Sequence, residues 1–305
     1  MANHAPRQLR VAVVQMDPTV ERVEDNIKKA RKLTDGLKRG TVDLVCFSEM
    51  IFTGYVFPSY KALEPHIERP GEGPTFSFCS ELAKRLSCHV VAGYPERLSP
   101  LNETIASEVL KAVEEEKTAE IQFAGNSATL IGPDGSVIGN YRKSNLYEAD
   151  MPWAQAGTGF TSFTLPGLPK LSIGICMDLN PRPDSEWITG RSPKELADYC
   201  IEDDIGLLIL PCAWLDSEAE TNYNIDLHNI DYWCRRLDPL FNEENTGTTR
   251  ETIVVVVNRT GFEQGTLFAG SSMVAKLRRG SGKPDIVGVM GRKEQACRIW
   301  TVDIA

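Results

Sequence analysis

Histidine is scarce in this chain, which contains four histidines among 305 residues. They are dispersed, so none has the ligand spacing of a zinc motif, and we expect no metal site. His4 lies in the tail, His66 in a loop and His228 in a predicted helix. His89 fits a satisfied histidine in a core strand. A Cys–His arrangement of the papain type is therefore not visible, and a nucleophile here needs another base.

Long apolar runs, paired cysteines and phosphate loops are also missing. No run approaches the roughly 18 apolar residues of a membrane span, and the N-terminus holds no apolar signal core. The eight cysteines are scattered without a CxxC pair, which predicts reduced thiols and an intracellular protein. We expect it in the cytoplasm, with the nucleus and the mitochondria as open alternatives. The glycines of Gly132–Gly135 and Gly280–Gly282 fit turns and not a phosphate-binding loop.

Positive charge is in deficit. The chain has 33 lysines and arginines against 42 aspartates and glutamates, a formal net charge of −9. This balance argues against non-specific binding of nucleic acid, which relies on a basic surface. A content of 42% hydrophobic and 25% charged residues is typical of a globular protein with a large core. We therefore expect neither nucleic acid nor a membrane as a partner.

Apolar runs alternate with helix-like segments early in the chain, and strands cluster later. This order predicts one α/β domain with sheets packed in layers. We expect strands at 9–16, 42–49, 88–94, 206–211, 252–258, 270–275, 285–290 and 296–304, paired strands within 123–142 and 160–175, and helices at 23–37, 76–86, 192–202 and 221–240.

The predicted domain spans residues 9–305 and follows an N-terminal tail of residues 1–8. The stretch 97–120 differs from the rest, because it has few large apolar residues and contains the acidic run Glu114–Glu116. We interpret this stretch as a surface insertion.

Three apolar runs stop on side chains with reactive chemistry, namely Glu49, Lys143 and Cys176. Each alone has an ordinary explanation: a solvated strand end, a surface lysine and a core thiol like that expected for Cys46. Open α/β sheets, however, keep their chemistry at strand ends. A carboxylate that takes a thiol proton and a lysine that stabilises a carbonyl oxyanion would make the thiol a nucleophile.

The blocks that carry these residues resemble the nitrilase superfamily of carbon–nitrogen hydrolases. The resemblance implies a four-layer α-β-β-α sandwich and a Glu-Lys-Cys triad without a cofactor. It assigns Glu49 as general base, Lys143 as oxyanion stabiliser and Cys176 as nucleophile. Glu148 is the nearest candidate for the further glutamate that is often catalytic in this superfamily. The matching blocks are Val11–Met16, Leu44–Glu49, Tyr141–Lys143, Gly174–Asp178 and Phe268–Ser272, within a similarity that runs from Leu9 to Ile304.

One departure from the usual superfamily pattern narrows the resemblance to a single branch. Many members of the superfamily carry an arginine shortly after the cysteine, where this chain has Asn180. Together with segments 143–148 and 52–57, this departure resembles the fungal protein N-terminal amidase branch. Enzymes of that branch deamidate N-terminal Asn and Gln and so feed the degradation pathway that reads N-terminal residues. The resemblance implies peptides or proteins with a free N-terminal Asn or Gln as partners.

Such a substrate presents a free α-ammonium group, which needs a carboxylate and hydrogen-bond acceptors when it is buried. We predict that Asp178 binds this group with help from Asn180, although a capping role in the turn is an equally open alternative for Asp178. The N–H of Met177 is expected to bind the oxyanion. The predicted pocket walls, each of which could instead be core, are Tyr55, Trp153 and Trp187.

Two other classes of function stay open. A small-molecule amidase, an ω-amidase or an N-carbamoyl amidohydrolase would use the same triad on a small acid amide. A substrate carboxylate usually calls for a cationic partner, so Asn180 counts against these enzymes. A non-catalytic scaffold would keep the fold for assembly, and the intact triad argues against it. Dimers are common among superfamily members, so the resemblance also allows a homodimer.

Overall fold

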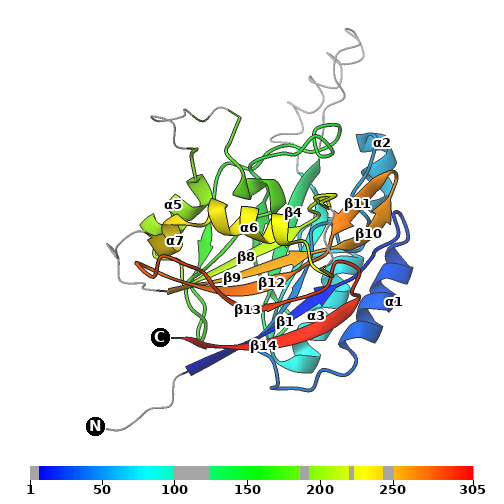
Figure 1. Ribbon diagram of the computed structural model, residues 1–305. Coiled ribbons are helices and arrows are strands. Elements are labelled where there is room, and N and C mark those ends of the chain that lie inside the picture. Colours follow the sequence, from blue (N-terminus) through cyan, green and yellow to red (C-terminus); the bar gives the residue numbers. More distant parts are fainter. Residues whose placement is uncertain are drawn as a thin grey trace.

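Two six-stranded sheets form the centre of the molecule (Figure 1). The computed structural model describes residues 7–98, 124–183, 185, 192–219, 223–242 and 251–304. The strand order is β14-β1-β2-β3-β4-β5 in the first sheet and β13-β12-β9-β8-β7-β6 in the second. The first sheet consists of β1 (Arg7–Gln15), β2 (Leu44–Phe47), β3 (His89–Arg97), β4 (Ala124–Ile131), β5 (Val137–Arg142) and β14 (Ala296–Ile304); the second consists of β6 (Ser162–Phe163), β7 (Leu171–Ile173), β8 (Leu207–Cys212), β9 (Glu251–Asn258), β12 (Met273–Arg278) and β13 (Asp285–Val289).

Helices cover the outer face of each sheet. The first sheet carries α1 (Val23–Thr34) and α3 (Pro74–Leu86), and the second carries α5 (Glu195–Glu202), α6 (Leu227–Arg236) and α7 (Pro239–Asn242). A short helix α2 (Tyr60–Leu63), a 3₁₀ turn over Glu64–His66 and a hairpin of β10 (Thr260–Glu263) and β11 (Thr266–Ala269) lie outside the two sheets. The predicted four-layer α-β-β-α sandwich is confirmed.

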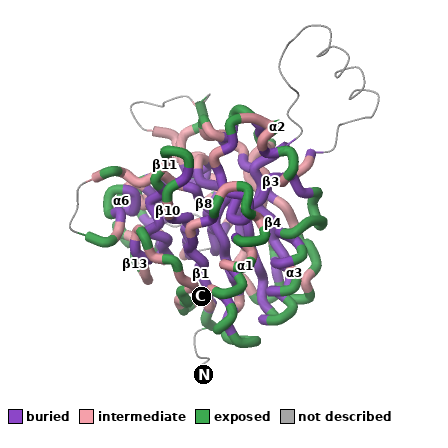
Figure 2. The backbone as a smooth tube through the Cα atoms, turned by 90° about the vertical axis from the view of Figure 1, so that its right-hand side faces the viewer, coloured by how far each residue is buried: buried purple, intermediate pink, exposed green. Residues whose placement is uncertain are grey.

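Strand β1 shows how the layers arise from the sequence. Successive side chains of a strand point to opposite faces of its sheet. Val11 and Val13 therefore lie in the core between the sheets, while Ala12 and Val14 pack against α1 and α3. Because both faces are buried, the strand appears in the sequence as one apolar run without alternation. Figure 2 shows the resulting buried interior, with exposed residues on the outer helices and loops.

The structure confirms most predicted elements and corrects several boundaries. Strand β1 begins at Arg7, so the predicted tail is two residues too long; Arg7 and Gln8 pair with β14. The helix expected over 221–240 begins only at Leu227, because Asp226 caps it by accepting from the N–H of Asn229. The β10–β11 hairpin was not predicted, since its strands are short and two of its apolar residues face outward.

The predicted insertion over 97–120 lies largely outside the described residues. Within it, Arg97 is the last residue of β3, and Leu98 is buried. Among the helices that the structure describes, none has both the length and the apolar character needed to cross a membrane.

Candidate active site

The ends of three strands deliver the three predicted catalytic side chains. Glu49 follows β2 in the first sheet, Lys143 follows β5 in the same sheet, and Cys176 follows β7 in the second. Glu49 and Lys143 are fully buried, and Cys176 is 8% exposed. The charges of Glu49 and Lys143 both act on the Cys176 thiol. The sandwich thus brings the predicted triad together at one end of the facing sheets.

Lys143 lies between two buried carboxylates. Its Nζ donates to Glu49 Oε1 at 2.7 Å and to Asp150 Oδ2 at 2.7 Å. Burial alone would lower the pKa of Lys143, but the charges of Asp150 and Glu49 outweigh burial and place the pKa well above its ordinary value. The lysine is therefore an ammonium group throughout the working pH range and can stabilise negative charge on a substrate oxygen.

The carboxylate of Glu49 is held from two further sides. Asn126 Nδ2 donates to Oε1 at 2.6 Å, and the backbone N–H of Ala213 donates to Oε2 at 2.7 Å. Burial raises the pKa of Glu49, and the charge of Lys143 opposes this rise. A carboxylate with a raised pKa is a stronger base than an exposed glutamate, as the deprotonation of a thiol requires.

Cys176 occupies a strained turn. Its φ of 44° lies in the left-handed region, which a residue with a side chain adopts only when its surroundings impose it. A 3₁₀ turn over Cys176–Leu179 starts at this residue. Burial raises the pKa of the Cys176 thiol well above its ordinary value, with further contributions from Cys212 and Glu49. The resting thiol is protonated, so attack requires transfer of its proton to a base.

A cavity of about 160 Å³ opens onto the thiol. Met177 and Asn180, both predicted to contact substrate, lie in its wall. Sequence reasoning missed the stretch Ala213–Leu215, which follows β8 as the triad residues follow their own strands. The complete described lining is Tyr147, Cys176, Met177, Asn180, Ala213, Trp214 and Leu215.

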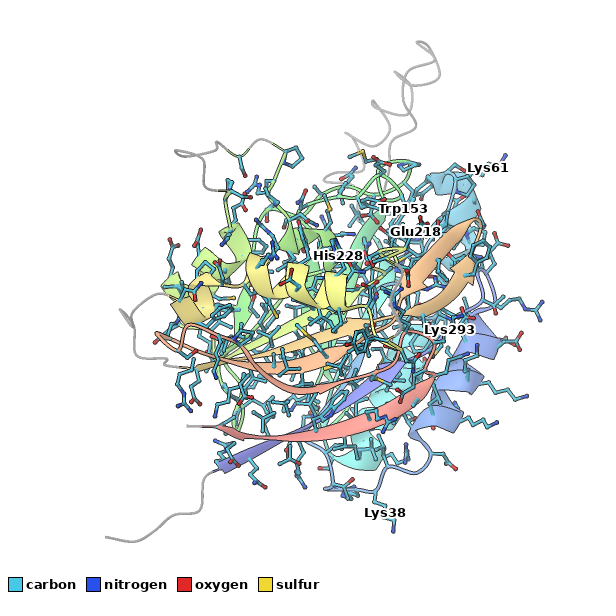
Figure 3. The ribbon with its side chains drawn as sticks, in the orientation of Figure 1. Lys38, Lys61, Trp153, Glu218, His228 and Lys293 are labelled. Carbon is cyan, nitrogen blue, oxygen red and sulfur yellow. The ribbon has the colours of Figure 1, made fainter. Side chains whose placement is uncertain are left out.

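Two of the three aromatic residues predicted as pocket walls, Tyr55 and Trp153, are not part of this described lining. Tyr55 is buried, and the centre of its ring lies 5.6 Å from Lys143 Nζ. Trp153 is a fully buried core residue whose Nε1 donates to Ala149 O at 2.8 Å (Figure 3). Trp187 lies outside the described residues. Tyr55 thus packs against the predicted catalytic lysine, and Trp153 belongs to the core.

Asp178 lies behind the cavity wall with both oxygens occupied. Oδ1 accepts from the N–H groups of Ser144 and Asn145 at 3.0 and 2.8 Å. Oδ2 accepts from the hydroxyl of Tyr141 and the N–H of Ile175, both at 2.8 Å. These four donors favour the capping role over direct binding of an ammonium group. Asp178 joins the chain after Lys143 to the turn that carries Cys176.

Glu148 does not reach Lys143. It is exposed, whereas Asp150 is fully buried against the lysine and also accepts from Asn126 Nδ2 and the N–H of Tyr147. The second carboxylate of the site is therefore Asp150 in place of the predicted Glu148. The turn between Lys143 and Asp150 determines which carboxylate lies against the lysine. The course of this turn could not be predicted from the sequence.

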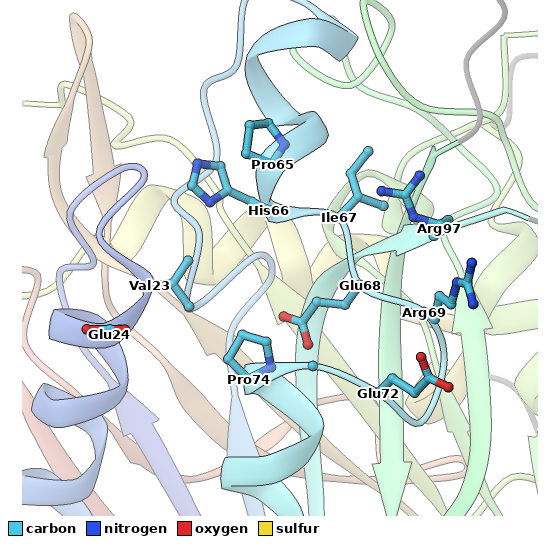
Figure 4. A pocket seen from close by; sticks show the side chains of 11 residues that line it. Val23, Glu24, Pro65, His66, Ile67, Glu68, Arg69, Glu72, Pro74 and Arg97 are labelled. Carbon is cyan, nitrogen blue, oxygen red and sulfur yellow. The ribbon is translucent and has the colours of Figure 1, made fainter.

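Histidine does not contribute to the described pocket lining. His228 is exposed on α6 (Figure 3), and His89 is a buried residue at the start of β3. His66 borders a separate hollow of about 500 Å³ beside Glu68 and Arg97 (Figure 4). That hollow is larger than the active-site cavity, but its lining includes no residue of the triad. Within the described parts of the chain, no three His, Cys, Asp or Glu side chains are grouped to hold a metal.

Comparison with known proteins identifies the family. Residues 10–181 match the family model described as carbon-nitrogen hydrolase, so the chain belongs to the carbon-nitrogen hydrolase family. It is a hydrolase that acts on carbon–nitrogen bonds other than peptide bonds.

Curated relatives agree with this assignment. The protein N-terminal amidase of Schizosaccharomyces pombe is 29% identical over 89% of this chain and 92% of its own length. The protein N-terminal amidase of Saccharomyces cerevisiae is 28% identical over 72% of this chain, and the match spans 48% of that relative. A nitrilase of Pyrococcus abyssi is 25% identical over 97% of this chain and 90% of its own length.

Solved structures share the fold. A crystal structure of N-terminal amidase superposes with a TM-score of 0.74, at 21% identity, over 97% of this chain and 99% of the other. Related structures of that protein contain an Asn-Glu-Ala or a Gln-Val peptide.

Proposed function

We propose that the protein is an N-terminal amidase that hydrolyses the side-chain amide of N-terminal Asn and Gln to Asp and Glu, with release of ammonia. The observation that carries this proposal is the cavity: it opens on Cys176, is small, and has no lysine or arginine in its described lining. Such a cavity suits an uncharged amide side chain. Among the residues that the structure describes, the lining offers no cationic partner to the carboxylate of an ω-amidase or N-carbamoyl substrate. The two yeast relatives named protein N-terminal amidase support the same choice.

The reaction begins with proton transfer from the Cys176 thiol to Glu49. The thiolate attacks the amide carbon, and the new oxyanion is held by Lys143 Nζ and the backbone N–H of Met177. Glu49 returns the proton to the nitrogen as the carbon–nitrogen bond breaks, so ammonia leaves and a thioester remains. Glu49 then takes a proton from water, which attacks the thioester carbon, and Cys176 departs and recovers its proton.

The α-ammonium group of the substrate would lie at the mouth of the cavity, beside Asn180 and Trp214. The amide oxygen of Asn180 and the face of an indole ring both attract a cation. Asp178 acts there as a positioning residue. It binds the N–H of Asn145, and Asn145 Nδ2 in turn donates to the carbonyls of Met177 and Asn180 at 3.0 and 3.3 Å. The products, chains that begin with Asp or Glu, would enter the pathway that degrades proteins according to their N-terminal residue.

The proposal is tested by ammonia release from Asn-Gly-Ser and Gln-Gly-Ser peptides, each free and N-acetylated, with Cys176→Ala as the inactive control. Release from the free peptides alone, lost in Cys176→Ala, supports the proposal. Turnover of the acetylated peptides or of small amides would reassign the enzyme to another amidase of the family. No turnover of any amide would favour a scaffold.

A further inference from the structure

A second thiol lies beside the nucleophile. Strands β7 and β8 run parallel, with Ile173 opposite Ile209. Strand β7 ends at Ile173, and Cys176 starts the 3₁₀ turn that follows it. This turn packs against β8, whose last residue is Cys212. The Cys212 thiol donates to Leu210 O at 3.4 Å and lies close enough to the Cys176 thiol to raise the pKa of that thiol. Cys212 is 1% exposed, and no step of the amidase reaction uses it.

The course of the backbone suits a covalent link. The N–H of Gly174 donates to Ile209 O at 3.0 Å, so the chain that leads to Cys176 still lies beside β8 after β7 has ended. A disulfide needs its two Cα atoms roughly 4.4–6.8 Å apart. Both thiols belong to the same buried core cluster, and all cysteines in the described residues are free. Cys176 also lines the cavity, so a small oxidant can reach it without unfolding, whereas Cys212 is not part of the described lining.

We propose that Cys176 and Cys212 form a redox modification site, in which peroxide oxidises the nucleophile and Cys212 resolves it to a reversible disulfide. This proposal goes beyond the amidase function and requires only a reactive Cys176. The enzyme is switched off while the disulfide exists, and reduction by a thiol restores it. Without Cys212, the oxidised nucleophile would proceed to sulfinic acid, which thiols do not reduce.

The chemistry balances in two steps. In the first, the Cys176 thiolate, whose proton is on Glu49, attacks an oxygen of hydrogen peroxide. The O–O bond breaks, and the departing hydroxide takes the proton from Glu49 as water. In the second, the sulfur of Cys212 attacks the sulfenic sulfur of Cys176, and the leaving hydroxide takes the Cys212 proton as a second water. The two thiols are oxidised together by two electrons, and peroxide is reduced to water.

Other cysteines are less suited to this role. Cys46 lies on β2 in the first sheet, and its neighbouring thiol is Cys88. Cys200 belongs to the same core cluster as the nucleophile but lies on α5, where its charged neighbours are Arg279 and Asp203. Cys200→Ala is therefore a matched control, because it removes a buried thiol from the same core without removing a neighbour of Cys176.

The test treats wild type, Cys212→Ala and Cys200→Ala with hydrogen peroxide and measures intact mass, the linked peptides, and amidase activity before and after dithiothreitol. We expect wild type and Cys200→Ala to lose two hydrogens, to yield a peptide that joins Cys176 to Cys212, and to recover most activity. Cys212→Ala should gain two oxygens at Cys176 and recover less than about a tenth.

The proposal fails if wild type gains oxygen at Cys176 without forming the disulfide, or if Cys212→Ala recovers as fully as wild type. If Cys212→Ala does not fold, the peptide map of oxidised wild type decides alone. Because the masses and linked peptides are measured without substrate, a protein that releases no ammonia from Asn and Gln peptides still gives a decisive result here.

Discussion

Lys143 shows how a single buried residue depends on the acids around it. A lone ammonium group in a dry interior would lose its proton, and its two carboxylates prevent this. Glu49 must also accept a proton during the reaction, so at that moment Asp150 is the remaining counter-charge. Asp150 therefore keeps the lysine charged when the oxyanion forms.

This role makes Asp150 and Glu148 a matched pair for mutation. Asp150→Asn removes one counter-charge, so the pKa of Lys143 should fall and kcat/KM should drop roughly 10- to 100-fold. The alkaline limb of the pH profile should move to lower pH. Glu148→Gln, two residues away on the surface, should stay within about twofold of wild type, as is usual for a group that touches no reacting atom. Steady-state ammonia release across pH measures both, and equal losses in the two variants would contradict the assignment.

We expect the ionisation of Glu49 to set the pH below which the enzyme loses activity. The general base must be ionised in the free enzyme, and burial raises its pKa. Activity should therefore be lost as pH falls through a value above the ordinary glutamate pKa of about 4.3. The pH dependence of kcat/KM measures this limb. A limb at or below the ordinary value would show that Glu49 is not the base whose ionisation limits the rate.

At the scale of elements, the sequence predicted those site residues that lie directly after strands. Glu49, Lys143 and Cys176 each follow an apolar run, so their meeting could be foreseen. Asp150 could not, because a turn decides which acid faces Lys143. The place of Cys212 could not be predicted either, because it depends on how the turn that carries Cys176 packs against β8.

Close approach of β2 and β3 positions Glu49. A Cβ on Gly93 would lie 2.6 Å from Glu49 Cα and 2.7 Å from Met50 N, both backbone atoms that cannot move aside. Gly93→Ala should therefore shift the end of β2, destabilise the fold by about 1–3 kcal/mol and reduce kcat/KM. Gly36→Ala is the control, because no atom lies within 4 Å of the position that its new methyl group would occupy. Thermal unfolding and ammonia release test both, and an active, stable Gly93→Ala would refute this view of the strand end.

At the scale of the whole molecule, a buried ion pair connects the two sheets beneath the site. Arg259 follows β9 in the second sheet, is fully buried and donates to Glu263 at 2.6 Å. Glu263 accepts from the N–H groups of Tyr55 and Val56, in the loop after β2 of the first sheet. Arg259 also stacks on Phe268, with its guanidinium carbon 3.9 Å from the ring centre. The pair holds the loop that supports Lys143.

Loss of either partner of the Arg259–Glu263 pair should lower the free energy of unfolding. Arg259→Met leaves the Glu263 carboxylate buried without its counter-charge, which typically costs about 3–5 kcal/mol. Arg298→Ala, which breaks an exposed pair with Glu294, should cost less than about 1 kcal/mol. Urea unfolding of both variants gives the comparison, and similar midpoints would mean that the buried pair contributes little. A homodimer remains a prediction at this scale.

The size of the cavity limits when a protein can be processed. A space of about 160 Å³ admits one side chain, so the scissile amide reaches Cys176 only if the first residues extend away from the body of their protein. An N-terminal Asn or Gln that packs within a folded domain would not reach Cys176 and would not be hydrolysed. In the proposed function, the enzyme would therefore act only on proteins whose N-terminal residues are accessible, either because the chain has been newly cleaved or because its N-terminal segment has unfolded.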